Sequence, residues 1–544
     1  MNEPNAVPEI ALQENLIRRV NVGDMLTRSA ARAPGQTALV EGRRRLSYRE
    51  LNDRVNRCAH GLVALGYRPG DALGLMSGNC IEFLVTYYAC AKIGVVCTPV
   101  NLFWRQGELS YVLTHAQVRG VVVQERWLGD LAQALGDLPA VRNVILMAGS
   151  TGSDVGLPGH VDLISLAQLG ESQPATEPEM LIDDRAPLSY LYTSGTTSAP
   201  KGVVGNHLAI YLETLGVVID LEMKARDRVV AMMPMFHTAQ LNAFCTPTIA
   251  SGATLYILEG FDAKILLDLI EAEQITITFG LPMMYRALLD EQQQRTRTVS
   301  SLRRAVYAMA PMPDDDLRRL IEVFGCELSL MFGQTEMSPA STCFRPEHQL
   351  SHPGAIGMPS INVQAGIMDE RGELLLWGQS GEIVYRSPHL LTKYLRDQGA
   401  SREAFKHGWF HSGDVGYFGQ DGMLWFEDRH KDVIKSGGEN IASIEVEKAL
   451  YAVEPKLAEV VVVGLPHERW GEAVTAVVTL RSGETIDAEG VLVRLRQKLS
   501  PFKCPKAVIV VGEMPKTATG KIQKTKVRQN FADYFRADKR LASV

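Results

Sequence analysis

The chain has 544 residues, of which 46% are hydrophobic, and a formal net charge of −6. A chain of this length buries a large core and is expected to fold as more than one domain. Acidic and basic residues are interspersed, and the local basic run at residues 43–45 is typical of a solvated loop or strand edge. Because no basic stripe matches a phosphate backbone, a nucleic-acid partner is not expected.

The cysteines and the apolar runs exclude further classes of protein. Eight cysteines are scattered without a Cys-x-x-Cys pair, so neither a disulfide framework nor a zinc site is expected. No apolar run reaches the roughly 18 residues that a membrane helix needs. The first residues lack a basic start followed by an apolar core. We therefore expect a cytoplasmic protein without integral membrane association, acting as a monomer or homodimer.

Apolar runs alternate with amphipathic helical stretches in the first part of the chain. Strands are expected at residues 72–76, 120–123, 187–192, 228–232 and 253–257, a regular pattern over residues 206–215, and an amphipathic helix over residues 262–273. This alternation favours an α/β fold of mostly parallel sheets covered by helices. The segment 147–179 is rich in Gly, Ser, Pro and Asp, which predicts an exposed excursion.

The pattern changes near Lys431, where a second unit is expected to begin. An amphipathic helix over residues 445–450 precedes an apolar strand over residues 460–463. The remaining stretch of about 110 residues is long enough for a small α+β domain. The sequence therefore predicts two domains, residues 1–430 and residues 431–544.

The residues 192–203 read YTSGTTSAPKGV and form the most informative segment of the chain. Its glycines permit a tight, closely approaching backbone, its hydroxyls donate hydrogen bonds, and Lys201 supplies a cation. The segment is not a Walker A loop, because Pro200 precedes Lys201 and Gly202 follows it. A flexible surface loop would share this composition, but regular elements on both sides pin the segment. It therefore predicts a polyphosphate site, and with it ATP.

Five further segments follow in a characteristic order. They read FGQTE at 332–336, GWFHSGD at 408–414, DRHKD at 428–432, IKSGGENI at 434–441 and PKTATGK at 515–521. Together with the segment 192–203 they resemble the motifs of the adenylate-forming superfamily, which includes acyl- and aryl-CoA synthetases, peptide-synthetase adenylation domains and luciferases. The resemblance implies a large N-terminal adenylation domain with a small β subdomain and a small mobile C-terminal domain, hinged at Lys431.

The resemblance also implies the catalytic residues. Lys521 would neutralise the charge that develops at the α-phosphate of ATP. Glu336 and Thr196 would hold Mg²⁺ against the phosphates, because hard oxygen atoms are the ligands that Mg²⁺ prefers. His237 would border the acyl site and control access of the second substrate, although a buried structural histidine is an alternative interpretation.

Further positions of the motifs are implied to bind ATP and coenzyme A. For ATP these are Thr193, Ser194, Gly195, Thr197, Lys201, Ala310, Pro311, Phe332, Gly333, Gln334, Thr335, Asp414 and Arg429, the last two at the ribose hydroxyls. For coenzyme A, after a rotation of the small domain, they are Lys435, Gly437, Gly438, Trp470, Phe502 and Lys506.

The chain departs from the family pattern at three positions of interest. Ser198 replaces a glycine of the phosphate loop, and Met309 stands where the family commonly has glycine, which is expected to reshape the acyl pocket. Cys504 lacks the charge of the arginine that some CoA ligases carry there. Coenzyme A remains the expected thiol, with a carrier-protein pantetheine as an open alternative.

The sequence thus predicts an ATP-dependent carboxylic acid:CoA ligase. The apolar segment 239–250 and nearby methionines favour a hydrophobic fatty, aryl or polycyclic acid. His237 replaces the aspartate that peptide-synthetase domains often carry, which disfavours an α-amino acid. Two alternatives stay open: an adenylating enzyme that transfers the acyl group to a carrier protein or an amine, and a non-catalytic ligand-binding paralogue.

Overall fold

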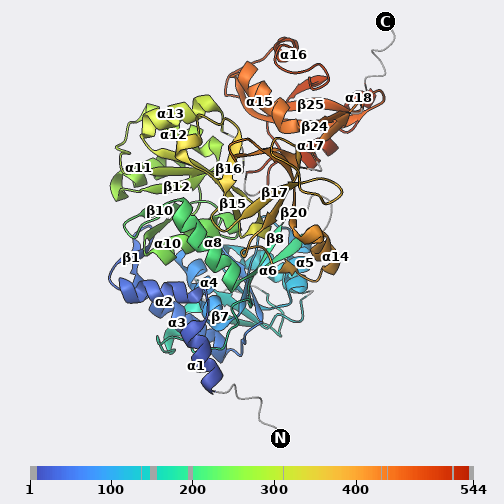
Figure 1. Ribbon diagram of the computed structural model, residues 1–544. Helices are drawn as coiled ribbons and strands as arrows, with labels where there is room; N and C mark the ends of the chain where they lie inside the picture. Colours follow the sequence, from blue (N-terminus) through green and yellow to red (C-terminus); the bar gives the residue numbers. More distant parts are fainter. Residues whose placement is uncertain are drawn as a thin grey trace.

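The structure of the protein is a computed structural model that describes residues 9–136, 138–147, 156–193, 200–309, 312–429, 432–437, 439–517 and 520–537. Figure 1 shows a large body, which holds the elements up to the strand β21, and a smaller unit above it, which holds the elements from α15 onward. Two mixed sheets, each with a block of parallel strands, form the large body with helices around them. The predicted α/β fold is therefore confirmed.

An eight-stranded sheet lies in the lower part of the large body. Its order is β19-β9-β8-β4-β3-β5-β6-β7. The strands are β3 Ala72–Met76, β4 Val96–Pro99, β5 Val118–Val123, β6 Asn143–Leu146, β7 Asp162–Ser165, β8 Pro187–Thr193, β9 Lys201–Asn206 and β19 Lys393–Tyr394. The six strands from β8 to β7 pair in parallel, whereas β9 and β19 pair antiparallel.

A thirteen-stranded sheet has the order β17-β18-β20-β21-β16-β15-β14-β13-β12-β10-β11-β1-β2. Its strands are β1 Thr37–Glu41, β2 Arg44–Ser47, β10 Arg228–Ala231, β11 Thr254–Ile257, β12 Ile277–Gly280, β13 Arg304–Tyr307, β14 Glu327–Gly333, β15 Ala340–Phe344, β16 Ala355–Pro359, β17 Gln364–Met368, β18 Gly381–Arg386, β20 Phe410–Phe418 and β21 Leu424–Arg429. The strands β1 and β10 to β14 pair in parallel, and the antiparallel strands after β14 form the expected β subdomain.

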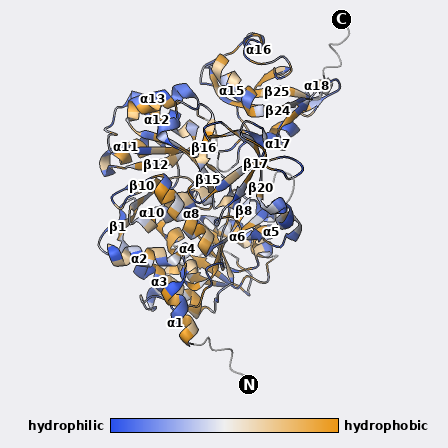
Figure 2. Ribbon diagram, viewed as in Figure 1, coloured by the Kyte–Doolittle hydropathy of each residue, from blue (hydrophilic) through white to orange (hydrophobic). Residues whose placement is uncertain are grey.

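Helices cover the two sheets and the small unit. They are α1 Glu9–Arg18, α2 Gly23–Arg32, α3 Tyr48–Ala64, α4 Ile81–Ile93, α5 Gln106–Ala116, α6 Leu128–Leu135, α7 Leu166–Glu171, α8 His207–Asp220, α9 Thr238–Gln240, α10 Thr246–Ser251, α11 Ala263–Glu273, α12 Pro282–Gln294, α13 Asp314–Phe324, α14 Gln398–Ala404, α15 Ser443–Val453, α16 Ala488–Leu495, α17 Lys524–Asn530 and α18 Tyr534–Ala537. Figure 2 shows hydrophobic residues concentrated in α4, all but one of whose residues are buried. Among the described helices, none is both long and apolar enough to cross a membrane.

Local sequence signals explain where several helices begin. The side chain of Asp262 accepts a hydrogen bond from the backbone N–H of Ile265 at 2.8 Å, so it caps α11 as a helix N-cap should. The side chain of Asn206 caps α8 in the same way, through the N–H of Ala209. Both caps lie where a polar residue precedes an amphipathic run, which is why residues 262–273 could be predicted as helical.

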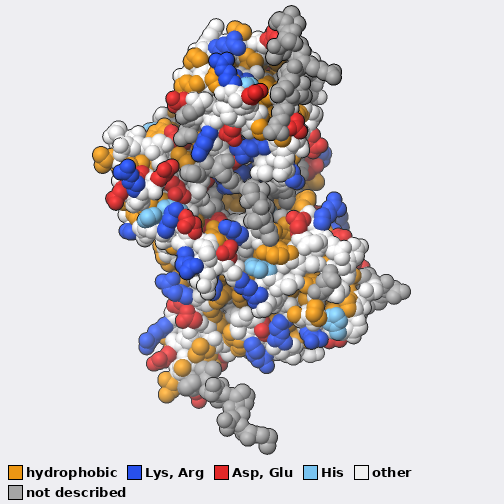
Figure 3. All heavy atoms as spheres, turned by 90° about the vertical axis from the view of Figure 1, so that its right-hand side faces the viewer, with side chains coloured by type: hydrophobic (Ala, Val, Ile, Leu, Met, Phe, Trp, Pro, Cys, Tyr) orange, Lys and Arg blue, Asp and Glu red, His pale blue; other side chains and the backbone are white. Residues whose placement is uncertain are grey.

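The small unit contains its own sheet and core. Its strands are β22 Ile434–Ser436, β23 Glu439–Ile441, β24 Leu457–His467, β25 Gly471–Leu480 and β26 Ala507–Val510, in the order β23-β22-β25-β24 with β26 beside β25. Its core residues include Ile434, Val446, Leu450, Val462, Val478 and Leu495. Figure 3 shows positive and negative side chains mixed over one face of the molecule, without a large field of a single sign.

One organisational prediction is partly wrong. Segment 147–179 was expected to be an exposed excursion, yet it contributes β7 to the edge of the eight-stranded sheet and α7 against α3. The side chains of Leu166 and Leu169 are buried in this contact. The physical reason is that a short amphipathic turn within a polar segment still packs when a sheet edge lies beside it.

Candidate active site

The parallel strands of the thirteen-stranded sheet bring several motifs together. Strands β10, β12, β13 and β14 run in the same direction, so their carboxyl ends lie at one edge of the sheet. The residues that follow these ends include His237, Leu281, Met309 and Glu336. Open α/β sheets bind ligands at this edge. The fold therefore gathers the motifs into one candidate site.

The phosphate segment connects two antiparallel strands. Thr193 at the end of β8 pairs with Lys201 at the start of β9. The Lys201 Nζ atom lies 5.0 Å from the centroid of the Tyr394 ring, within the range of a cation–π contact. Ser194, Gly195, Thr196 and Thr197, together with Ser198, lie outside the described residues. The structure thus fixes both ends of the predicted loop.

Glu336 is held beside this hairpin by a residue that the motifs did not reveal. The Tyr394 hydroxyl donates a hydrogen bond to Glu336 Oε1 at 2.9 Å, and the Leu391 N–H donates to the Glu336 carbonyl at 2.7 Å. Burial and the adjacent Glu336 carboxylate raise the pKa of Tyr394, so the hydroxyl stays a donor. Tyr394 therefore links Lys201 to Glu336. A lone tyrosine in a segment without a motif gave no signal for this role.

Asp414 and Arg429 form an ion pair in which Asp414 is buried and the Arg429 side chain is 37% exposed. They face each other across β20 and β21, and Arg429 Nε lies 3.3 Å from Asp414 Oδ1. The Asp414 residue is only 2% exposed, which argues against an ordinary surface ion pair. The Phe332 ring at the end of β14 lies 5.3 Å from the Phe426 ring on β21. A carboxylate, a guanidinium and an aromatic ring are thus available for a nucleoside.

His237 follows β10 and is kept neutral. Its Nε2 atom is shielded from solvent and has no hydrogen-bond partner among the described residues. Burial lowers the pKa of His237 to about 4. Asn79 holds the preceding segment, since its amide donates to the Met233 carbonyl at 3.0 Å and accepts from the Met235 N–H at 2.9 Å. A neutral imidazole with an unused nitrogen can make one hydrogen bond to a ligand.

Met309, which stands where the family commonly has glycine, has a backbone conformation that favours glycine. Met309 has a φ of 69°, in the left-handed region that favours glycine. Its side chain is 39% exposed, so it does not add to the core. Ala310 and Pro311, which follow it, lie outside the described residues.

The turn that carries Lys521 contacts the large body. The Thr517 N–H donates to the Lys521 carbonyl at 2.8 Å, and Gly520 closes the turn with a φ of +80°. A Cβ atom on Gly520 would lie 2.9 Å from Leu281 Cδ1, directly after β12. Arg286 of α12 adds a hydrogen bond to the Ala458 carbonyl at 3.2 Å. The small unit therefore presents the Lys521 turn to the edge where the strand ends converge.

A second group of predicted residues gathers on the small unit. The Gly437 N–H donates to the Trp470 carbonyl at 2.8 Å, and a Cβ atom on Gly437 would lie 3.3 Å from the Trp470 ring. Lys506 Nζ lies 5.0 Å from the centroid of that ring. The Lys435 side chain is exposed on β22, and Phe502 is exposed, with Lys503 Nζ 5.7 Å from the centroid of its ring. Lys431 and Gly438 lie outside the described residues.

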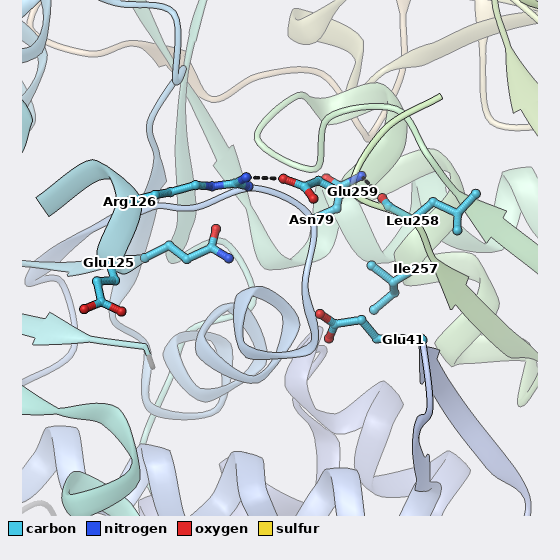
Figure 4. Close-up of a pocket in the computed structure, with 9 residues that line it drawn as sticks. Glu41, Asn79, Glu125, Arg126, Ile257, Leu258 and Glu259 are labelled. Atoms are coloured by element: carbon cyan, nitrogen blue, oxygen red, sulfur yellow. Dashed lines mark hydrogen bonds and ion pairs between the residues drawn. The ribbon is translucent and has the colours of Figure 1, made fainter. Parts of the chain in front are cut away.

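A hollow of about 620 Å³ lies at the carboxyl ends of β1, β3, β5 and β11 (Figure 4). Three glutamates, Glu41, Glu125 and Glu259, line it together with Arg126, which pairs with Glu259. None of the predicted site residues is in its lining. Because the lining is acidic, the hollow is unsuited to ATP or to a carboxylate substrate.

The fold and the gathered motifs define an adenylate-forming enzyme. In agreement with this class, residues 26–395 match the family model described as AMP-binding enzyme, and residues 445–521 match the model of the AMP-binding enzyme C-terminal domain. The chain therefore belongs to the AMP-binding enzyme family, in its acyl- and aryl-CoA synthetase branch.

Relatives extend over nearly the whole chain. A feruloyl-CoA synthase from Amycolatopsis sp is 33% identical over 95% of this chain and 100% of its own length. An indoleacetate–CoA ligase from Aromatoleum aromaticum is 32% identical over 94% of this chain and 98% of its own. Among solved structures, the anthranilate CoA ligase AuaEII with anthranoyl-AMP has a TM-score of 0.86 at 25% identity, covering 94% and 97% of the two chains. ATP-bound MatB from Rhodopseudomonas palustris has a TM-score of 0.85 at 27% identity, covering 95% and 100%.

Proposed function

We propose that the protein is an ATP-dependent carboxylic acid:CoA ligase. It forms an acyl-adenylate from the acid and ATP, and then an acyl-CoA from the adenylate and coenzyme A. The observation that carries the proposal is the position of the Lys521 turn against Leu281, at the edge where Glu336 and His237 also lie. The names of the relatives support the same activity, since those compared above are CoA ligases or synthases.

In the first half-reaction a carboxylate oxygen attacks the α-phosphate of ATP, the bond to the bridging oxygen breaks, and pyrophosphate leaves. Lys521 neutralises charge at the α-phosphate and at the attacking carboxylate. Asp414 accepts hydrogen bonds from the ribose hydroxyls and Arg429 donates to the same sugar, while Phe332 packs against adenine. Lys201 and the hydroxyls of the phosphate segment hold the leaving pyrophosphate.

Glu336 fits a magnesium site. Its Oε1 atom is engaged by Tyr394, which leaves Oε2 without a partner among the described residues. Glu336 and Thr196 would hold the ion, whose charge, when bound, neutralises the phosphates and assists departure of pyrophosphate. Tyr394 keeps the carboxylate oriented toward the hairpin that carries the phosphate segment.

In the second half-reaction the thiol of coenzyme A attacks the acyl carbon and AMP leaves. The small domain, residues 431–544, rotates about Lys431 for this step. Lys435, Gly437 and Gly438 then line the thiol channel, and Trp470, Phe502 and Lys506 hold the nucleotide of coenzyme A. The contact of the Lys521 turn with Leu281 supports assigning the present arrangement to the first step.

The acid is a largely hydrophobic fatty, aryl or polycyclic acid. The interior behind His237 is rich in apolar side chains, among them the stacked rings of Phe244 and Phe279, whose centroids lie 4.2 Å apart. A neutral His237 carries no charge to recognise an α-amino acid. The enzyme works in the cytoplasm on small molecules, as a monomer or homodimer.

Product analysis tests this function and its alternatives. Purified protein is given ATP, Mg²⁺ and a panel of aliphatic, aryl and polycyclic acids, with coenzyme A, with a pantetheine-loaded carrier protein, or with no acceptor. Mass spectrometry then follows pyrophosphate, AMP and acyl products. Acyl-CoA with AMP supports the proposal. Acid-dependent pyrophosphate without acyl-CoA would favour a carrier-protein or amine acceptor, and no pyrophosphate with any acid would favour the non-catalytic paralogue.

A further inference from the structure

Glu213, on α8, is a buried carboxyl group that the mechanism above does not use. The residue is 1% exposed, and neither carboxyl oxygen makes a hydrogen bond within the described residues. The Ala340 amide approaches it without completing hydrogen-bond geometry, and burial raises the pKa of Glu213 well above its usual range. A buried polar group left without a partner costs about 1–3 kcal/mol, so native proteins rarely keep one without a reason.

A chain of polar side chains leads from the buried Tyr87 on α4 to the segment after His237, beside α8. Burial raises the pKa of the Tyr87 phenol well above its usual range, and Cys97 and then the Glu213 carboxyl add to this effect. The Tyr87 hydroxyl lies 3.4 Å from Asn242 Oδ1, and the Asn242 amide donates to Thr238 Oγ1 at 2.9 Å. We call Glu213, Tyr87, Asn242 and Thr238 the polar strip. It runs from α8 through α4 to the residue that follows His237.

The polar strip crosses an otherwise apolar interior. Its members are each 6% exposed or less. Around it lie Phe236, Phe244 and Phe279, which belong with Tyr87 to one buried cluster. Asn242 is in a π-helix, Leu241–Cys245, which contacts α8. Such π-helical segments occur frequently at functional sites. Figure 1 shows α8 and α10 crossing the front of the large body near β10, whose end leads to His237.

No counter-charge accounts for Glu213. Within the described residues it has no ion pair, and Asp220, two helical turns further on, adds a second carboxyl to its surroundings. Asp220 itself has Arg345 at 3.6 Å. A buried carboxyl group with a purely structural role normally has a basic side chain beside it, as Asp220 has Arg345. The Glu213 carboxyl therefore lacks a hydrogen-bond partner among the described residues, and a polar group of a bound ligand would supply one.

We propose that Glu213 determines substrate specificity by accepting a hydrogen bond from a hydroxyl or amino group at the end of the acid remote from its carboxylate. This rests on the proposed function and on His237 bordering the acyl site. One helical turn from Thr238 to Asn242 is about 6 Å long, and the 3.4 Å contact from Asn242 to Tyr87 extends the path toward α8, so the donor lies on the order of 10 Å from that carboxylate. The preferred acid is thus apolar along its length and carries one polar group at its far end.

Matched pairs of acids test the proposal. Values of kcat/KM for acid-dependent pyrophosphate release are compared for 8-hydroxyoctanoate and octanoate, and for 4-hydroxycinnamate and cinnamate. The wild-type enzyme is expected to favour the hydroxylated member about 10- to 100-fold, because the unhydroxylated acid leaves Glu213 unpaired. A further arm with 8-aminooctanoate distinguishes an amino donor from a hydroxyl donor.

Variants assign the preference to this side chain. In Glu213→Leu the ratio of kcat/KM for the hydroxylated acid to kcat/KM for its unhydroxylated partner is expected to fall to near 1. In Glu213→Gln, which keeps an acceptor, this ratio is expected to stay above 3. Glu222→Gln, an exposed glutamate just beyond α8, serves as the matched control and should keep the wild-type ratio. An unchanged ratio in Glu213→Leu, or no preference in the wild-type enzyme, would overturn the proposal, as would a buried water satisfying Glu213 permanently.

The failure of the specificity proposal can be distinguished from failure of the proposed function. If octanoate and 8-hydroxyoctanoate both release pyrophosphate at equal rates, the ligase stands and Glu213 has no role in selection. If no acid releases pyrophosphate, ligand-induced thermal stabilisation by the same pairs measures binding directly. Preferential stabilisation of the wild-type protein by the hydroxylated acid, lost in Glu213→Leu, would then still support the proposal, and equal stabilisation would refute it.

Discussion

Replacing Tyr394 by phenylalanine removes one hydroxyl group that orients the metal-site carboxylate. The variant loses the 2.9 Å hydrogen bond to Glu336 but keeps the ring that faces Lys201. A hydrogen bond to a charged acceptor contributes about 1.5–3 kcal/mol. Since 1.4 kcal/mol corresponds to a factor of ten, we expect kcat/KM for adenylation to fall about 10- to 150-fold.

Acid-dependent exchange between ATP and pyrophosphate, measured over a range of Mg²⁺ concentrations, reports this step. Tyr394→Phe should require more Mg²⁺ to reach its lower maximum. Tyr67→Phe is the matched control, because the buried Tyr67 hydroxyl has no hydrogen-bond partner within the described residues. Exchange by Tyr394→Phe within twofold of wild type, with the same Mg²⁺ dependence, would refute the role given to Tyr394.

Three further predictions concern Lys521, coenzyme A and acid stability. Lys521→Ala should slow adenylation about 10²–10³-fold, whereas Lys526→Ala, also exposed on the same segment, should not; equal effects would contradict the assignment. Trp470→Ala should raise the KM for coenzyme A and leave ATP–pyrophosphate exchange unchanged. Slowed exchange would contradict the assignment of Trp470 to coenzyme A binding. Burial lowers the pKa of His389 to about 4. His389 is therefore neutral in the fold, and its contribution to stability is present above pH 6.5 and lost as the pH falls toward 4. The shift of the pKa from 6.5 to about 4 corresponds to about 3 kcal/mol of unfolding free energy. His389→Gln should therefore flatten the decline of the urea midpoint over that pH range, and an unchanged decline would refute it.

Much of the fold follows from the hydrophobic pattern of the sequence. The expected strand at 72–76 coincides with β3, and Asp262 marks the start of α11 as its residue type suggests. These features are local, since a period of two or of 3.6 residues and a capping side chain are read from neighbouring residues. The motifs of the candidate site are equally local signals, because each is a contiguous run of residues, and the roles given to their residues stay predictions.

Contacts between distant segments could not be predicted. Tyr394 reaches Glu336 only because the two-residue strand β19 pairs with β9, and no pattern in a two-residue strand specifies that pairing. Glu213 likewise reads as a polar residue in the middle of a helix, for which solvent exposure is the usual expectation. Its burial follows from α8 lying against β15 and the π-helix, a tertiary arrangement that the local sequence does not encode.

The adenylate route is tested most directly by following the oxygen atoms of the acid. An accepted acid labelled with ¹⁸O in its carboxyl group is converted with ATP, Mg²⁺ and coenzyme A, and the masses of AMP, pyrophosphate and phosphate are recorded. Because a carboxylate oxygen attacks the α-phosphate and stays there when the thiol displaces AMP, the account predicts one ¹⁸O atom in AMP and none in pyrophosphate. Label in inorganic phosphate, or unlabelled AMP alongside acyl-CoA, would contradict it.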